Sequence, residues 1–176
     1  MNKREFLKKT SLAIGATILP LPNLSCESST EEMIRTAHIG VGNMGLEDLK
    51  AIASHPNVIV TALCDVDENN LKAAHELFPD AEIFQDYRVL FNSISEQIDA
   101  LVVSTPDHTH APASLMAMEN NKNVYCQKPL THYVSESREM RRVANEKGLV
   151  TQMGIQVHSF YDYKLATYLI RGGIIG

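Results

Sequence analysis

The chain has 176 residues, a formal net charge of −5 at pH 7, and hydrophobic and charged fractions of 44% and 21%. These values are ordinary for a globular enzyme domain. The net negative charge does not indicate a positively charged surface for binding nucleic acid. The three cysteines, at positions 26, 64 and 126, show no metal-type or CxxC spacing, so no metal site is predicted. Cys64 and Cys126 each end an apolar run and are expected to be buried core thiols.

The first 32 residues are predicted to be an export signal and a linker. Residues 2–11 are basic, and residues 12–21 form an apolar core that is too short to span a bilayer. The stretch Lys3-Arg4 with Phe6-Leu7 resembles a twin-arginine signal in which lysine replaces one arginine, and this leaves the export route open. An amphipathic N-terminal helix is the alternative. We expect an exported protein.

A cysteine near the end of this segment raises the question of a lipid anchor. Cys26 after Leu24-Ser25 resembles a lipoprotein cleavage site, although Asn23 stands where leucine is usual. Both outcomes stay open: a membrane-anchored lipoprotein attached through Cys26, or a periplasmic protein released by ordinary cleavage.

The rest of the chain alternates strand and helix patterns. Strands are expected at 36–41, 57–64, 82–85, 98–104, 123–126 and 149–153, and helices at 44–54, 68–78, 87–94, 111–120, 135–146 and 161–170. Strict alternation implies parallel strands joined by right-handed crossovers. Residues 33–156 are therefore predicted to form an α/β domain with a doubly wound parallel sheet, a Rossmann fold.

A glycine-rich turn follows the first strand. Gly40, Gly42 and Gly45 have Gly-x-Gly-x-x-Gly spacing, with Asn43 and Met44 between the last two. In a dinucleotide site the first glycine permits the turn, the second lets the pyrophosphate approach, and the third lets the helix pack on the strand. The free N–H groups and the dipole at the start of that helix would hold the phosphates.

An acid at the end of the second strand supports this interpretation. Asp65 lies twenty positions beyond Gly45, where a carboxylate can accept hydrogen bonds from both ribose hydroxyls of the adenosine half. It would repel a 2′-phosphate, which favours NAD over NADP. The alternative is a solvated acid in a turn. Asp67 is the better candidate for the cap of the following helix.

The loop after the fourth strand is also rich in polar side chains. In Ser104-Thr-Pro-Asp-His-Thr-His110, Asp107 is expected to cap the next helix, and His108 and His110 to lie at the edge of the cleft. Two histidines with this spacing can bind a metal, but apart from Asp107, which is expected to cap the helix, no carboxylate or cysteine partner lies close in sequence. A polar loop that touches the cofactor is the better account.

A lysine follows the fifth strand. Lys128 lies between the strand end and Pro129, and next to a nicotinamide ring its ammonium could stabilise an alkoxide and move a proton. Partial desolvation there would lower the pKa of the lysine. A surface lysine in a turn is the commoner case.

These motifs, in this order, resemble the glucose-fructose oxidoreductase / inositol dehydrogenase / MocA (Gfo/Idh/MocA) family. The resemblance covers residues 36–176, and Gln152-Met-Gly-Ile-Gln156-Val-His158 is similar to the exported bacterial branch. Gln127 stands where the family usually has glutamate before Lys-Pro.

The resemblance implies an NAD-dependent oxidoreductase that acts on a sugar or polyol, with a Rossmann domain followed by an α/β substrate domain. Residues 157–176 would begin the crossover to that second domain, so this chain is expected to be an N-terminal fragment, with homo-oligomers formed only by the full-length protein. The implied catalytic residues are Lys128 and His158. The implied cofactor contacts are Gly40, Gly42, Asn43, Met44, Gly45, Asp65, Ser104, Thr105, Pro106, His108, His110, Gln127, Lys128 and Pro129.

Two alternatives stay open. Some exported relatives are glycoside hydrolases that oxidise the sugar transiently, eliminate the leaving group, add water and re-reduce the sugar. A non-catalytic nucleotide-binding fragment is the other. The sequence does not identify the sugar.

Overall fold

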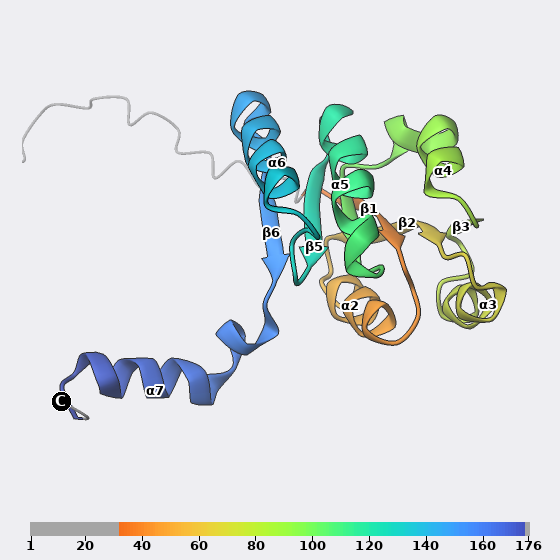
Figure 1. Ribbon diagram of the computed structural model, residues 1–176. Coiled ribbons are helices and arrows are strands. Elements are labelled where there is room, and N and C mark those ends of the chain that lie inside the picture. Colours follow the sequence, from red (N-terminus) through yellow and green to blue (C-terminus); the bar gives the residue numbers. More distant parts are fainter. Residues whose placement is uncertain (1–31, 175–176) are drawn as a thin grey trace, which may run out of the picture. The chain divides into compact units, whose positions relative to one another are not determined.

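The computed structural model describes residues 32–174, which form a six-stranded parallel sheet with helices on both faces (Figure 1). The predicted export segment, with Cys26, lies outside these residues. The order across the sheet is β3-β2-β1-β4-β5-β6, and every neighbouring pair is parallel. The strands are β1 (Ile34–Ile39), β2 (Val58–Cys64), β3 (Glu82–Phe84), β4 (Ala100–Val103), β5 (Asn123–Gln127) and β6 (Thr151–Gly154).

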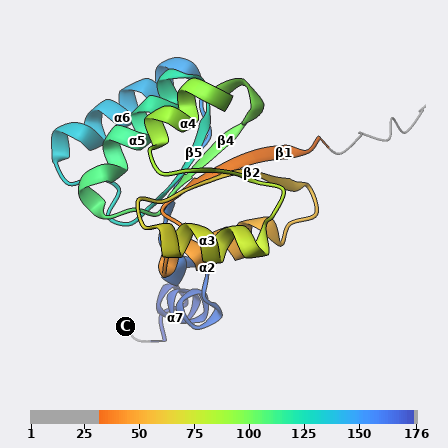
Figure 2. The ribbon, with the colours of Figure 1, turned by 90° about the vertical axis from the view of Figure 1, so that its right-hand side faces the viewer.

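Helices α2 and α3 cover one face of the sheet, and α4, α5 and α6 cover the other (Figure 2). This arrangement confirms the predicted doubly wound Rossmann fold. The helices are α2 (Met44–Ala53), α3 (Glu68–Leu77), α4 (Tyr87–Ile94), α5 (His110–Glu119), α6 (Val134–Lys147) and α7 (Tyr161–Arg171).

Two apolar cores stabilise the two faces. Along β2 the side chains alternate: Leu63 joins the core under α2 and α3, while Ala62 and Cys64 join the core under α4, α5 and α6. Leu49 and Leu101 are fully buried, one in each core. Each such leucine contributes about 1.5–3 kcal/mol by leaving water.

Most element boundaries differ from the predictions by one or two residues, and one predicted helix cap is wrong. The first strand ends at Ile39, because Gly40 with φ 80° already begins the turn. The sixth strand begins at Thr151 rather than 149. The predicted cap by Asp107 is wrong: the Thr109 N–H donates to the carbonyl of Pro106, which makes a short 3-10 turn, and α5 begins only at His110.

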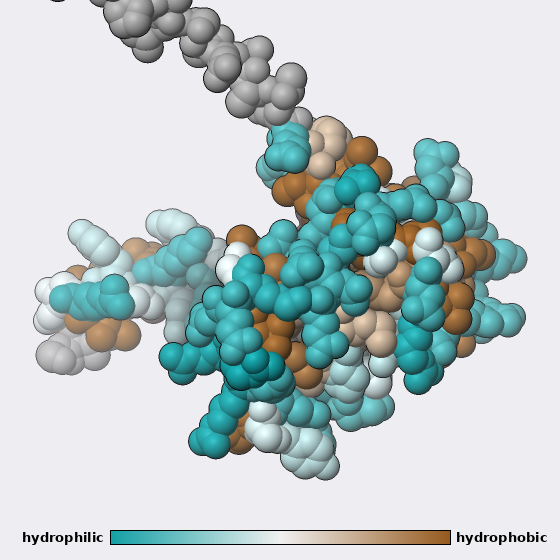
Figure 3. Space-filling view, turned by 90° about the horizontal axis from the view of Figure 1, so that it is seen from above, coloured by the Kyte–Doolittle hydropathy of each residue, from teal (hydrophilic) through white to brown (hydrophobic). Residues whose placement is uncertain are grey.

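The surface seen from above is mostly hydrophilic, with hydrophobic side chains showing in several separate places (Figure 3). Helix α7 has no buried residue, and Tyr161, Leu165, Tyr168 and Ile170 on it are all exposed. Of the helices in residues 32–174, none combines the length and the hydropathy needed to cross a membrane.

Candidate nucleotide-binding site

The glycine turn after β1 is packed too closely for side chains. A Cβ on Gly40 would lie 2.7 Å from the carbonyl oxygen of Ser104, and a Cβ on Gly45 would overlap the carbonyl oxygen of Gly40. A Cβ on Gly42 would meet the amide of Asn70. Helix α2 is therefore pressed directly against the turn, as the spacing predicts.

The first turn of α2 is open to a ligand. Asn43 precedes the helix with φ 46°, and no side chain in the described part of the protein caps the helix there. The Gly45 and Leu46 N–H groups donate to the carbonyls of Gly42 and Asn43, at 2.9 and 3.1 Å, and the start of the helix carries the positive end of its dipole. This end of α2 is therefore suited to bind an anion such as a pyrophosphate.

Asp65 is held at the end of β2 by two backbone contacts. One carboxylate oxygen accepts from the Val41 N–H and the other from the Asp67 N–H, both at 2.9 Å. The side chain is only 9% exposed, which rules out a solvated turn acid. Each oxygen keeps a further lone pair, which can accept from a ribose hydroxyl. Asp67 caps α3 as predicted, accepting from the Asn69 N–H at 2.8 Å.

The carboxyl ends of β1, β2 and β4 border an open cavity of about 610 Å³. Its volume suits a small molecule or part of a dinucleotide. Nine of the predicted contacts line it: Gly40, Gly42, Asn43, Met44, Asp65, Ser104, Thr105, Pro106 and His108. Gly45 lies behind this wall, packed against Gly40.

Sequence reasoning missed several residues that line the cavity. Val66 is 86% exposed at its rim, and Asn70 lines it from the first turns of α3. Gln85 and Tyr87 line it from just after β3. Ligands in such sheets bind at the carboxyl ends of the strands, and β3 ends at the same edge of the sheet as β1, β2 and β4. Applying this to β3 would have predicted Gln85 and Tyr87.

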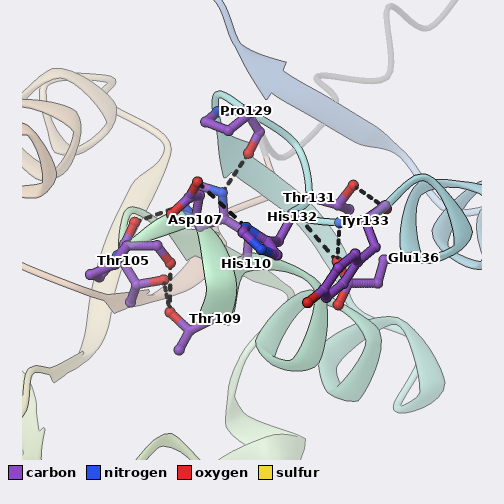
Figure 4. A network of polar contacts seen from close by, with 10 residues as sticks. Thr105, Asp107, Thr109, His110, Pro129, Thr131, His132, Tyr133 and Glu136 are labelled. Atoms are coloured by element: carbon purple, nitrogen blue, oxygen red, sulfur yellow. Dashed lines mark hydrogen bonds and ion pairs between the residues drawn. The ribbon is translucent and has the colours of Figure 1, made fainter.

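His110 does not line the cavity, and its contact with the cofactor stays a prediction. Its ring is 1% exposed, with Nδ1 2.6 Å from the carbonyl oxygen of Pro129 and Nε2 2.7 Å from that of Thr105 (Figure 4). Its role here is to join two loops. His108, by contrast, is exposed and lines the cavity. The two rings therefore do not converge on one metal.

The loop after β5 lies outside the cavity lining as well. Gln127 is 5% exposed and turned toward Asp48 of α2. Lys128 is exposed, so the predicted partial burial of its side chain is not seen. Pro129 follows in a cis peptide, and its carbonyl contacts His110. None of these three residues lines the cavity, and their contact with the cofactor stays a prediction.

The second predicted catalytic residue does not line the cavity either. His158 lies in a 3-10 turn (Gln156–Ser159), is exposed, and stacks on Tyr163 with ring centroids 5.2 Å apart. Within residues 32–174, no three His, Cys, Asp or Glu side chains gather in a way that could hold a metal ion.

Both cysteines of the described region are buried and free, as predicted. Cys64 contributes to the cavity wall, and burial, with help from Asp65 and Asp86, raises the pKa of its thiol to about 12. Burial raises the pKa of Cys126 to about 11. Burial of this kind favours the protonated thiol, which suits a structural role for both cysteines.

Comparison with known proteins agrees with this geometry. Residues 34–155 match the model of the Gfo/Idh/MocA family, described as an oxidoreductase family with an NAD-binding Rossmann fold. A 2,7-anhydro-N-acetylneuraminate hydratase of Mediterraneibacter gnavus is 29% identical over 80% of this chain and 36% of its own length. A glycosyl hydrolase family 109 protein of Shewanella pealeana is 26% identical over 100% of this chain and 44% of its own.

Solved structures show the same fold. The crystal structure of myo-inositol 2-dehydrogenase from Lactobacillus plantarum superposes with a TM-score of 0.75 at 26% identity, covering 82% of this chain and 43% of that one. The chain thus spans less than half the length of these relatives.

Proposed function

Because the chain belongs to the Gfo/Idh/MocA family of NAD-binding oxidoreductases, we propose that it acts in hydride transfer between NAD and a carbon of a sugar or polyol. The observation that carries this proposal is the cavity where the glycine turn, the start of α2 and Asp65 meet. NAD supplies the hydride acceptor. The described residues supply its binding site.

Each part of the cavity suits one part of the dinucleotide. Asp65 would accept from the hydroxyls of the adenosine ribose, with Val66 and Asn70 beside the adenine. The first turn of α2 would hold the pyrophosphate. Ser104, Thr105, Pro106 and His108 would line the remaining wall, toward the nicotinamide half.

Lys128 and His158 are proposed to act on the substrate side. The Lys128 ammonium would stabilise the alkoxide and move the hydroxyl proton during hydride transfer. His158 would line the substrate pocket. Both side chains are exposed in the described residues, so we propose that a substrate domain covers them.

A substitution at Asp65 tests the binding site. Asp65→Ala should weaken NAD binding by about 1–3 kcal/mol, which is about 5- to 150-fold in Kd. Because the carboxylate would repel a 2′-phosphate, the variant should also bind NADP about as well as NAD. A change in the ratio of NADP affinity to NAD affinity distinguishes loss of the Asp65 contact from a general loosening of the fold. Asp80→Ala, at an exposed turn residue, is the matched control for calorimetric titration. Unchanged affinity in Asp65→Ala would remove Asp65 from the site.

A glycoside hydrolase is the second candidate. The match to the Shewanella pealeana protein spans the whole chain, including the N-terminal segment, and favours this class. Candidate glycosides incubated without added NAD distinguish the two. Release of free sugar without net redox change indicates the hydrolase, and NAD reduction equal to product formation indicates the dehydrogenase. NAD binding without either activity indicates a nucleotide-binding module alone.

We also propose export, with the N-terminal segment as a cleaved signal. A C-terminally tagged precursor should be found outside the cytoplasm, shortened by roughly 25 residues. Cys26→Ser should release the protein from the membrane only if that cysteine carries a lipid. Cytoplasmic protein that keeps Met1 would contradict the proposal.

A further inference from the structure

A buried carboxylate joins α2 to two strand ends, of which the one at Ser104 lines the cavity and the one at Gln127 does not. Asp48 is 7% exposed, and its Oδ2 accepts from the hydroxyl of Ser104 at 2.7 Å. The side-chain amide of Gln127 donates to both carboxylate oxygens, at 2.8 and 3.0 Å. Ser104 follows β4 and Gln127 ends β5, so one side chain of α2 holds the carboxyl ends of both strands.

The same glutamine also holds the backbone of the next residue. The Lys128 N–H donates to Oε1 of Gln127 at 3.1 Å. Gln127 therefore gives its N–H groups to Asp48 and takes a hydrogen bond from Lys128. This chain of contacts runs from the helix that follows the glycine turn to the lysine of the β5 loop.

We propose that Asp48 and Gln127 are positioning residues that fix the backbone of Lys128 relative to α2, an inference that rests on the proposed role of Lys128. The pair is chemically matched, because Asp48 needs a donor at position 127 and the Lys128 N–H needs an acceptor there. Glutamine supplies both, whereas an ionised glutamate supplies only the acceptor. The amide at position 127 is therefore the partner that the carboxylate of Asp48 requires.

The neighbours of the pair leave little room for another arrangement. A Cβ on Gly154 of β6 would lie 2.5 Å from the Tyr125 hydroxyl and 3.0 Å from the side-chain carbon Cδ of Gln127. Burial raises the pKa of Tyr125, and the charge of Asp48 adds to the rise. Among residues 32–174, no lysine or arginine lies within ion-pair distance of Asp48. The carboxylate depends on its hydrogen-bond donors.

The test exchanges the two functional groups. Gln127→Glu would place two carboxylates together, and Asp48→Asn would place two amides together. The double variant Asp48→Asn/Gln127→Glu restores one donor and one acceptor, and the Lys128 N–H keeps its acceptor. Each single variant should raise the unfolding equilibrium constant about tenfold or more, and the double variant should recover most of that loss. Gln97→Glu, at an exposed glutamine, is the charge-matched control.

The backbone amide signal of Lys128 in an ¹⁵N NMR spectrum reports positioning directly, without NAD. Two adjacent carboxylates share a proton, so this signal should move with pH between about pH 5 and about pH 8 in Gln127→Glu. It should stay fixed in the wild type and in the double variant. If Gln127→Glu does not fold, Asp48→Asn serves instead: the amide oxygen at position 48 can still accept from Gln127, but the amide nitrogen there lies against the same donor, so the pair must rearrange and the Lys128 signal should shift.

Independent, additive effects of the two substitutions, with a Lys128 signal unmoved in every variant, would overturn the proposal. NADH titrations on the same samples keep the two questions separate. A wild type that binds no NADH would reject the proposed function, while the NMR result would still decide whether Asp48 and Gln127 hold Lys128.

Discussion

The ring of His110 lies 2.6 Å from the carbonyl oxygen of Pro129, and its other nitrogen lies 2.7 Å from that of Thr105. One buried side chain thereby joins the loop after β4, which lines the cavity, to the loop after β5, which carries Lys128 (Figure 4).

His110→Ala should therefore loosen both loops. The substitution leaves two carbonyl groups without this partner and opens a cavity, so the free energy of unfolding should fall by about 2–4 kcal/mol. NADH affinity should fall as well, because the Thr105 carbonyl loses its contact with the ring. His55→Ala is the matched control, since His55 is exposed and does not line the cavity. Urea unfolding measures the loss of stability, and a separate fluorescence titration of the folded protein with NADH measures the loss of affinity. Equal stability of the two variants would contradict the bridging role.

Gly45→Ala should damage both the fold and the site. The added methyl group would overlap the Gly40 carbonyl and lie 3.2 Å from the Cβ of Ser104, so α2 must move away from the turn. Overpacking of this kind costs about 1–3 kcal/mol, and NAD binding should be largely lost.

Gly148→Ala gives the contrast for that experiment. Gly148 has φ 64° and no atom within 4 Å of an added Cβ, so only backbone strain is introduced. It should lose about 1 kcal/mol of stability and keep its NAD affinity. A Gly45→Ala protein that binds NAD normally would show that close packing of α2 is not needed.

Stability should fall on acidification because of His38. The Thr36 hydroxyl donates to the Ile59 carbonyl, so its oxygen accepts from Nε2 of His38, and Nδ1 has no partner among the described residues. Burial lowers the pKa of His38 from 6.5 to about 3. Between these values the unfolded chain binds a proton that the folded chain does not.

His38 should therefore add its full stabilisation above about pH 6.5 and lose it as the pH falls toward 3, at about 1.4 kcal/mol per pH unit. His38→Gln keeps a side-chain N–H but does not titrate, so its unfolding free energy should depend less on pH. His132→Gln, at an exposed histidine, should keep the slope of the wild type. Identical slopes in all three proteins would show that His38 titrates normally.

Lys128 is predicted to matter for turnover and not for cofactor affinity. In a form of the protein that turns over substrate, Lys128→Ala should lower kcat by on the order of 10²–10⁴-fold, while NADH binding changes little. The exposed Lys72 of α3 gives the control variant Lys72→Ala. Near-normal turnover in Lys128→Ala would reduce this lysine to a turn residue.

The parts of the site that the sequence predicts are those with short-range causes. The three glycines, Asp65 and the loop from Ser104 to His108 follow strands directly, and parallel strands bring such ends to one edge. The buried ends of β2 and β5 likewise fix Cys64 and Cys126 in the core.

The direction of individual side chains is not predictable in this way. His110 turns inward because two carbonyl groups from separate loops meet its ring, and Gln127 turns toward Asp48, which lies 79 positions away in the sequence. Such contacts depend on how the elements pack. Residue type and spacing alone therefore place His110, Gln127 and Lys128 near the cleft but do not tell which of them enters it.

The position of β4 beside β1 also sets an order of events during synthesis. The two strands pair directly although Arg35 and Asp99, joined at their starts, are 64 positions apart. When β1, the glycine turn and α2 have left the ribosome, the wall made by Ser104 and Thr105 has not yet been translated. Until β4 is made, the edge of β1 that will pair with it stays unpaired in the nascent chain. NAD can bind to the domain and stabilise it only after β4 has paired with β1.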